Sequence, residues 1–179
     1  MEKRKTRHES DAEKERNRDV NTIKLFILRL SVFLLTIYML FGVVFSVRRV
    51  PDLSMKPKLM AGDLTLAYRL ERDYVAGDVV YYVAGGKTRI GRVVARPGET
   101  VSVKDGSLYV NGSIVMDQDV YYKTEPFGEK VTYPCALGND RYFILGDMRE
   151  GARDSRFFGP VSGKDIQGKV IVAIRRSHI

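Results

Sequence analysis

Residues 99–116 read ETVSVKDGSLYVNGSIVM, and this stretch decides the fold class of the chain. It contains three short apolar runs, at 100–103, 108–110 and 114–116, which alternate with turn residues. Asp105-Gly106 and Asn111-Gly112 lie between the runs. Asp-Gly and Asn-Gly supply the positive φ angles that tight hairpins need. The stretch therefore predicts a three-stranded antiparallel meander.

Similar short apolar segments lie on both sides of the meander. Turn signals separate them, including Gly85-Gly86, which we interpret as a hairpin turn. No stretch after residue 50 keeps the 3.6-residue period of an amphipathic helix. The segments predict strands at 64–68, 79–83, 89–95, 141–145 and 166–174. We therefore expect a mainly β domain with antiparallel sheets, without internal repeats or a phosphate-binding loop.

An apolar run precedes this β domain. Residues 30–47, LSVFLLTIYMLFGVVFSV, carry no charge, and residues 25–28 extend the run beyond Arg29. About 20 helical residues cross a bilayer core of about 30 Å. We expect a charged tail at 1–24, a transmembrane helix at 25–47 and the β domain at 48–179. A cleaved signal peptide is the competing interpretation, but its apolar core would be shorter and would end at small residues, which are lacking here.

Charge around the apolar run predicts its orientation. The chain has 30 Lys and Arg against 22 Asp and Glu, a net charge of +8. Nine basic residues precede Leu30, and four follow the run closely: Arg48, Arg49, Lys56 and Lys58. The positive-inside rule then favours a cytoplasmic N-terminus, a single pass through the cell membrane and an extracellular β domain. Six acids in the tail nearly neutralise its cations, so the predicted partner is a membrane and not a nucleic acid.

Few residues in the chain suit metal or imidazole chemistry. The two histidines, His8 and His178, lie at the ends, and Cys135 is the single cysteine. This composition argues against an internal disulfide framework, a cysteine-based zinc cluster and a histidine-based catalytic triad in the core. We predict no metal site and no cofactor, and we interpret Cys135 as an inert small side chain.

Short motifs follow the apolar run in a fixed order. The first reads Pro51-Asp52-Leu53-Ser54-Met55-Lys56-Pro57, and the others are Gly77-Asp78-Val79-Val80, Arg92-Val93 with Pro97-Gly98, Gly146-Asp147, Asp154-Ser155-Arg156 and Phe158-Gly159. With the anchor, this order resembles the bacterial type I signal peptidases, which are membrane-anchored Ser-Lys peptidases. The resemblance covers residues 25–174 and implies an antiparallel signal-peptidase-like β domain.

The resemblance assigns roles to particular positions. Ser54 takes the place of the nucleophile, with Met55 and Pro57 near the site. The base lysine of the family falls on Gly91, and the serine that orients this lysine falls on Ala152. Many family members place a hydroxyl that helps bind the oxyanion where this chain has Asp52. The resemblance also implies structural roles, listed here together: Gly146, Asp147, Asp154 and Arg156.

The glycine at position 91 has a direct chemical consequence. A serine hydroxyl needs a base to accept its proton, and glycine has no side chain to serve. Loss of the base alone costs on the order of 10⁶ in turnover in triad peptidases. Lys87 lies four residues earlier on the same strand, about 13 Å away at about 3.3 Å per residue. Lys56 and Lys58 are close to Ser54 in sequence, without an evident buried site.

Two functions follow, and whether the chain is an enzyme stays open. The first is a catalytically impaired homologue that acts as an accessory or chaperone factor in pilus assembly. It would resemble the signal-peptidase-like pilus proteins of Gram-positive bacteria that have lost catalytic residues, and would hold exported pilin segments by strand addition. The alternative is an active signal peptidase that cleaves exported preproteins, with Ser54 as nucleophile and an unrecognised base.

Overall fold

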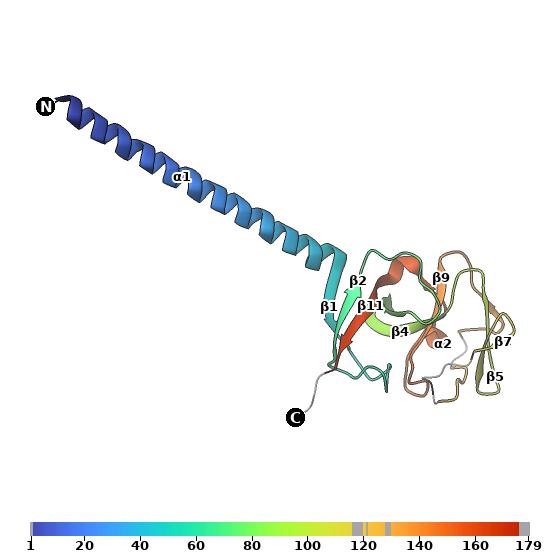
Figure 1. The fold of residues 1–179 in the computed structure, drawn as a ribbon. Coiled ribbons are helices and arrows are strands. Elements are labelled where there is room, and N and C mark those ends of the chain that lie inside the picture. Colours follow the sequence, from blue (N-terminus) through green and yellow to red (C-terminus); the bar gives the residue numbers. More distant parts are fainter. Residues whose placement is uncertain (1, 116–119, 121, 128–129, 176–179) are drawn as a thin grey trace. The chain divides into compact units, whose positions relative to one another are not determined.

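The computed structural model describes residues 2–115, 120, 122–127 and 130–175. Met116, the last residue of the predicted meander, lies outside the described residues. The chain divides into two compact units, residues 1–43 and residues 44–179. Each unit is described by itself below (Figure 1).

The first unit is helical. Helix α1 spans Glu2–Tyr38, and a π-helical segment continues it over Met39–Val44. Within these elements Arg18–Val44 is long and apolar enough to cross a membrane. The charged residues predicted as a tail therefore belong to the same helix as the apolar run.

The predicted end of the transmembrane segment at Val47 differs from the structure. Phe45–Arg49 form strand β1 instead, which pairs with β2 from Phe45↔Tyr68 to Arg49↔Leu64. Hydropathy alone does not distinguish an apolar helix from an apolar strand that follows it directly. The cross-strand partners supplied by β2, which are distant in sequence, decide the boundary.

The second unit contains two antiparallel sheets. The larger has the order β1-β2-β11-β3-β4-β9-β10, and the smaller has the order β7-β6-β5-β8. Their strands are β2 Leu64–Tyr68, β3 Val79–Ala84, β4 Lys87–Ala95, β5 Thr100–Lys104, β6 Ser107–Val110, β7 Ser113–Ile114, β8 Cys135–Ala136, β9 Arg141–Leu145, β10 Val161–Ser162 and β11 Ile166–Ile174.

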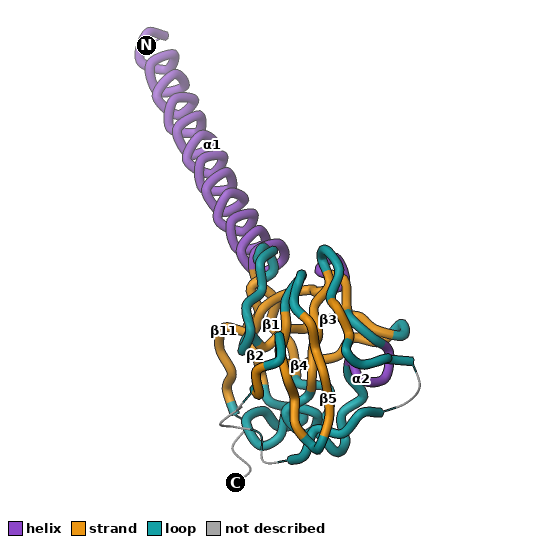
Figure 2. Tube along the Cα trace, turned by 90° about the vertical axis from the view of Figure 1, so that its right-hand side faces the viewer, coloured by secondary structure: helices purple, strands orange, loops and turns teal. Residues whose placement is uncertain are grey.

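Helix in the described part of the second unit is limited to α2 (Ser155–Phe158) and the 3-10 turn η2 (Gly163–Asp165) (Figure 2). The expected mainly β, antiparallel fold with one apolar N-terminal helix is thus confirmed.

The predicted meander corresponds to β5, β6 and β7. Its two turns have positive φ at both central residues, 53° and 72° at Asp105-Gly106 and 51° and 80° at Asn111-Gly112. Such turns match the right-handed twist of paired strands. Val101 and its neighbours then pack against Val94 and Phe143, so one apolar cluster joins the two sheets.

A separate apolar cluster fixes the segment that carries the first motif. Met55 is fully buried and packs with Val50, Leu59, Tyr81 and Ile90. Because Ile90 lies on β4, this packing holds the loop between β1 and β2 against the middle of the larger sheet. The position of Ser54, next to Met55 in sequence, follows from it.

We predict that Met55→Ala lowers the free energy of unfolding by about 3 kcal/mol, because it leaves a cavity in this cluster. Leu53→Ala is the matched control, since the Leu53 side chain is 46% exposed and its loss should cost well under 1 kcal/mol. Urea unfolding of both variants measures the difference. Equal losses would contradict the anchoring role of Met55.

Candidate functional site

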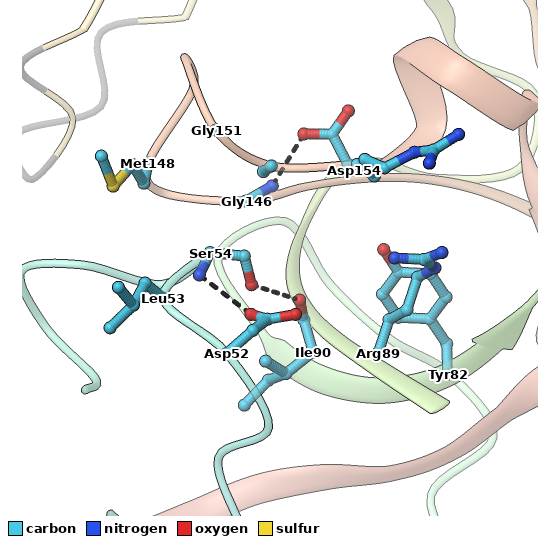
Figure 3. Close-up of a pocket in the computed structure, with 12 residues that line it drawn as sticks. Asp52, Leu53, Ser54, Tyr82, Arg89, Ile90, Gly146, Met148, Gly151 and Asp154 are labelled. Atoms are coloured by element: carbon cyan, nitrogen blue, oxygen red, sulfur yellow. Dashed lines mark hydrogen bonds between the residues drawn. The ribbon is translucent and has the colours of Figure 1, made fainter. Parts of the chain in front are cut away.

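Three segments meet at Ser54. Its N–H donates to Asp52 Oδ1 at 2.9 Å, and its carbonyl accepts the Met148 N–H at 2.9 Å. Its hydroxyl Oγ donates to the Ile90 carbonyl at 3.4 Å (Figure 3). Ser54 is therefore held by its own loop, by β4 and by the loop after β9.

A cavity of about 380 Å³ opens beside Ser54. It is lined by Asp52, Leu53, Ser54, Tyr82, Arg89, Ile90, Gly146, Met148, Gly151, Ala152, Arg153 and Asp154. The structure thus brings Ser54, Asp52 and Ala152 together from two distant parts of the chain. Met55 and Pro57 lie elsewhere, because Met55 points into the core and Pro57 is exposed.

Gly91 lies on β4 where its neighbours already fill the space of a side chain. A Cβ built on Gly91 would lie 2.7 Å from Ile144 Cγ2, 3.0 Å from the Leu145 carbonyl oxygen and 3.3 Å from Tyr82 Cε1. These separations are shorter than ordinary van der Waals contacts. The structure therefore leaves no empty space for a side chain at position 91, which the resemblance aligns with the base lysine of the family.

No lysine of the described residues lines the cavity. Lys87 is exposed at the start of β4, and Lys56 is only partly buried. Lys58 lines a different cavity, together with Leu59 and residues of β11. None of the three lysines considered as a replacement base thus lines the Ser54 cavity.

Gly146 allows the close approach of the segments around Ser54. A Cβ on Gly146 would lie 2.4 Å from the Ala152 Cβ and 2.8 Å from the Ser54 carbonyl oxygen. Any side chain at 146 would push the Ser54 loop and the Ala152 segment apart. Glycine is required here by packing.

A buried ion pair organises the loop after β9. Arg156 Nε donates to Asp154 Oδ1 at 2.9 Å, and Arg156 Nη2 donates to Asp154 Oδ2 at 2.8 Å. Asp154 Oδ2 also accepts the Gly146 N–H at 3.1 Å, and Arg156 Nη2 donates to the Arg149 carbonyl at 2.6 Å. Both ionic side chains are almost fully buried, and Arg156 Nη1 also donates to the Glu125 carbonyl at 3.2 Å.

A second ion pair connects the same loop to β4. Arg92 donates through Nε to Asp147 Oδ1 at 2.8 Å and through Nη2 to Asp147 Oδ2 at 2.6 Å. Arg92 Nη1 also donates to the Gly77 carbonyl at 2.9 Å. This pair thus links the second, third and fourth sequence motifs. Bidentate pairs of this kind add geometric specificity as well as energy.

The backbone N–H of Ser54 already donates a hydrogen bond to a carboxylate. In acyl transfer, backbone N–H groups near the nucleophile stabilise the negative charge that develops on the attacked carbonyl oxygen. Here the Ser54 N–H donates to the Asp52 carboxylate. An oxyanion at this place would compete with a negative charge for the same donor.

Tyr82 and Arg89 line the cavity, and sequence reasoning did not select them. They are direct register partners on β3 and β4. Burial raises the pKa of Tyr82, with further increases from the Asp154 and Asp52 charges and a decrease from Arg89, so the phenol keeps its proton. The sequence could have identified Arg89, because alternate residues of a strand share one face and Arg89 lies two residues before Gly91 on β4.

The second unit is thus an antiparallel β domain with Ser54 in a cavity, and it follows a helix long and apolar enough to cross a membrane. The sequence pattern described as "Signal peptidase, peptidase S26" matches residues 22–174. The chain therefore belongs to the signal peptidase S26 family, as the motifs predicted.

Two relatives agree with the family assignment. The chain is 32% identical over 141 residues to "Signal peptidase I V" of Bacillus subtilis, covering 71% of this chain and 84% of that protein. It is 31% identical over 137 residues to "Probable signal peptidase I-2" of Synechocystis, covering 70% of this chain and 61% of that protein. A crystal structure of a signal peptidase I from Enterococcus faecalis is 26% identical, covers 56% of this chain and 97% of that one, and gives a TM-score of 0.47.

We predict that Gly91→Ala lowers the free energy of unfolding by about 1–3 kcal/mol, because its methyl group overlaps Ile144 and the Leu145 carbonyl. Gly138→Ala is the control: no atom lies within 4 Å of its Cβ position, so its stability should change by less than about 0.5 kcal/mol. Thermal or urea unfolding compares them. A Gly91→Ala variant as stable as the control would show that position 91 can accept a side chain.

We also predict that Asp154→Asn destabilises the protein by about 3 kcal/mol, because it leaves the Arg156 charge buried without its carboxylate. Asp105→Asn is the matched control, because it makes the same chemical change in an exposed turn. Asparagine also tolerates the positive φ of this turn. It should unfold like the wild type. Similar unfolding midpoints for the two variants would contradict the structural role of Asp154.

Proposed function

We propose that this chain is a catalytically impaired member of the signal peptidase family that holds an extended segment of an exported protein at the Ser54 cavity without cleaving it. The observation that supports this best is the environment of the Ser54 hydroxyl. Its hydrogen-bond partner is the Ile90 carbonyl, and the cavity lining among the described residues contains no lysine.

The carbonyl partner cannot act as a base for Ser54. A peptide carbonyl accepts a hydrogen bond but does not take up a proton at neutral pH, so the hydroxyl stays a weak nucleophile. The two carboxylates of the cavity already have other partners. Asp154 is paired with Arg156, and Asp52 accepts the Ser54 N–H through Oδ1. Proton acceptance and oxyanion stabilisation are therefore both weakened at this site.

Peptide binding requires neither of these groups. Among the described strands, β4 pairs only with β3 between Lys87 and Gly91, and its pairing with β9 begins at Arg92. The Ile90 carbonyl faces Ser54, so this part of the β4 backbone points toward the cavity. An extended segment could add to β4 there through main-chain hydrogen bonds, with side chains entering the cavity.

Membrane attachment fits the same proposal. The apolar helix and the family assignment indicate a membrane-anchored protein that acts on or beside exported preproteins. We propose a cytoplasmic N-terminus and an extracellular β domain, because basic residues are concentrated before the apolar run.

We further propose that the clients include pilin subunits and that the chain is an accessory factor in pilus assembly at the surface of a Gram-positive cell. This follows from the resemblance, through Gly91, to signal-peptidase-like pilus proteins. Cleavage of exported preproteins by Ser54 with an unrecognised base is the second candidate. The retained serine and the names of the similar proteins favour it.

Cleavage is tested with the full-length protein in detergent and a labelled preprotein, with Bacillus subtilis signal peptidase I V as the positive control. We expect no product from the wild type. Gly91→Lys combined with Ala152→Ser should also give no product, because Ile144 and Tyr82 occupy the space beside position 91. Cleavage by the wild type that disappears in Ser54→Ala would overturn the proposal.

The role in assembly is tested by complementation of a deletion strain of the source organism. We expect Ser54→Ala to restore pilus polymers as fully as the wild-type gene, because the proposed role uses no nucleophile. Immunoblots of cell-wall extracts measure the polymers. Rescue by the wild type but not by Ser54→Ala would favour the peptidase instead.

A further inference from the structure

Arg89 is a cation in the wall of the Ser54 cavity. It lines the Ser54 cavity from β4, two residues before Gly91, and its side chain is partly buried. Two contacts hold it in place. Its Nε donates to the Ala84 carbonyl at 3.4 Å, and its guanidinium carbon lies 5.7 Å from the centre of the Phe158 ring.

Most of the hydrogen-bonding capacity of Arg89 remains available. An arginine side chain carries five N–H donors, four of them on the two Nη atoms. Among the residues that the structure describes, neither Nη atom of Arg89 has a hydrogen-bond or ion-pair partner. The guanidinium is therefore oriented by its Nε and by Phe158, while its forked end remains free to bind a planar anion.

Tyr82 provides a second donor at the same place. Its side chain is 1% exposed, yet it lines the cavity directly across from Arg89 in the β3–β4 register. Figure 3 shows the Tyr82 ring and the Arg89 guanidinium on the same side of the cavity, with Ser54 and Asp52 on the other. Its hydroxyl has no hydrogen-bond partner among the described residues.

Neither acid of the cavity lining forms a hydrogen bond or ion pair with Arg89 or Tyr82 among the described residues. Both Asp154 oxygens accept hydrogen bonds from Arg156, and one also accepts the Gly146 N–H. Asp52 directs Oδ1 to the Ser54 N–H. Arg153, the other arginine of the lining, lies over the Phe157 ring at 5.3 Å and adds a further positive charge.

We propose that the Ser54 cavity recognises a carboxylate of the bound peptide through the Arg89 guanidinium and the Tyr82 hydroxyl. This inference rests on the proposed peptide-binding function and adds a specificity to it. The carboxylate comes from an aspartate or glutamate side chain or from a free C-terminus, which share the same planar geometry.

The test uses full-length protein in detergent and fluorescence anisotropy with short labelled peptides of alanine and threonine. One set has an amidated C-terminus and a single glutamate placed in turn at each central position, and the matched set has glutamine there. A third peptide has no acid but a free C-terminal carboxylate. We expect one of the carboxylate peptides to bind about tenfold more tightly than its neutral partner, the size expected for hydrogen bonds to a charged group.

Substitutions then assign the preference to Arg89. Arg89→Gln should abolish it and Arg89→Lys should keep part of it. Arg141→Gln should leave it unchanged, because Arg141 is exposed and lies outside the cavity lining. Unfolding curves check that each variant is folded. If Arg89→Gln does not fold, the comparison of glutamate and glutamine peptides on the wild-type protein still tests the preference for a carboxylate.

The outcomes separate this inference from the proposed function. Equal binding of carboxylate and neutral peptides by the wild type would overturn the inference and leave peptide binding intact. A preference that persists in Arg89→Gln would overturn the assignment to Arg89. Failure of every peptide to bind would overturn both proposals. A preference for the free C-terminus alone would support the inference and identify the source of the carboxylate.

Discussion

The Asp154 carboxylate is the constraint on which the site depends. Its two oxygens accept hydrogen bonds from the Arg156 side chain and backbone and from the Gly146 N–H. Removing both charges from water costs several kcal/mol per ion, and only this dense set of hydrogen bonds offsets it. The pair thereby fixes the turn in which Gly146 packs against Ala152 and the Ser54 backbone. The site retains its shape because this loop cannot relax without leaving a buried charge unpaired.

Several independent contacts hold Ser54 beside this loop. The position of Ser54 is set by backbone hydrogen bonds, by Met55 in the core and by the packing of Gly146. None of these depends on a lysine at position 91. Ile144 and Tyr82 instead lie close to Gly91, and the Arg89 guanidinium becomes a cation of the cavity wall. The proposed peptide binding at this cavity therefore requires no catalytic base.

Most of the fold could be predicted from the sequence because its signals are local. Asp105-Gly106 and Asn111-Gly112 encode hairpin turns through their own backbone preferences, and the predicted strands at 64–68, 141–145 and 166–174 coincide with β2, β9 and β11. The end of the apolar helix could not be predicted as well. Phe45–Val47 become strand because β2 supplies partners, and those partners lie about 20 residues farther along the chain.

By itself, the sequence determined the family, the apolar N-terminal segment, the serine at position 54 and the glycine at position 91, since each is a matter of residue identity and order. Only the tertiary structure decided what surrounds these residues. The filled space beside Gly91, the Ser54 N–H bound to Asp52 and the Arg89–Tyr82 pair in the cavity all arise between segments distant in the chain. Such contacts depend on strand register and side-chain packing, which no local pattern of residues specifies.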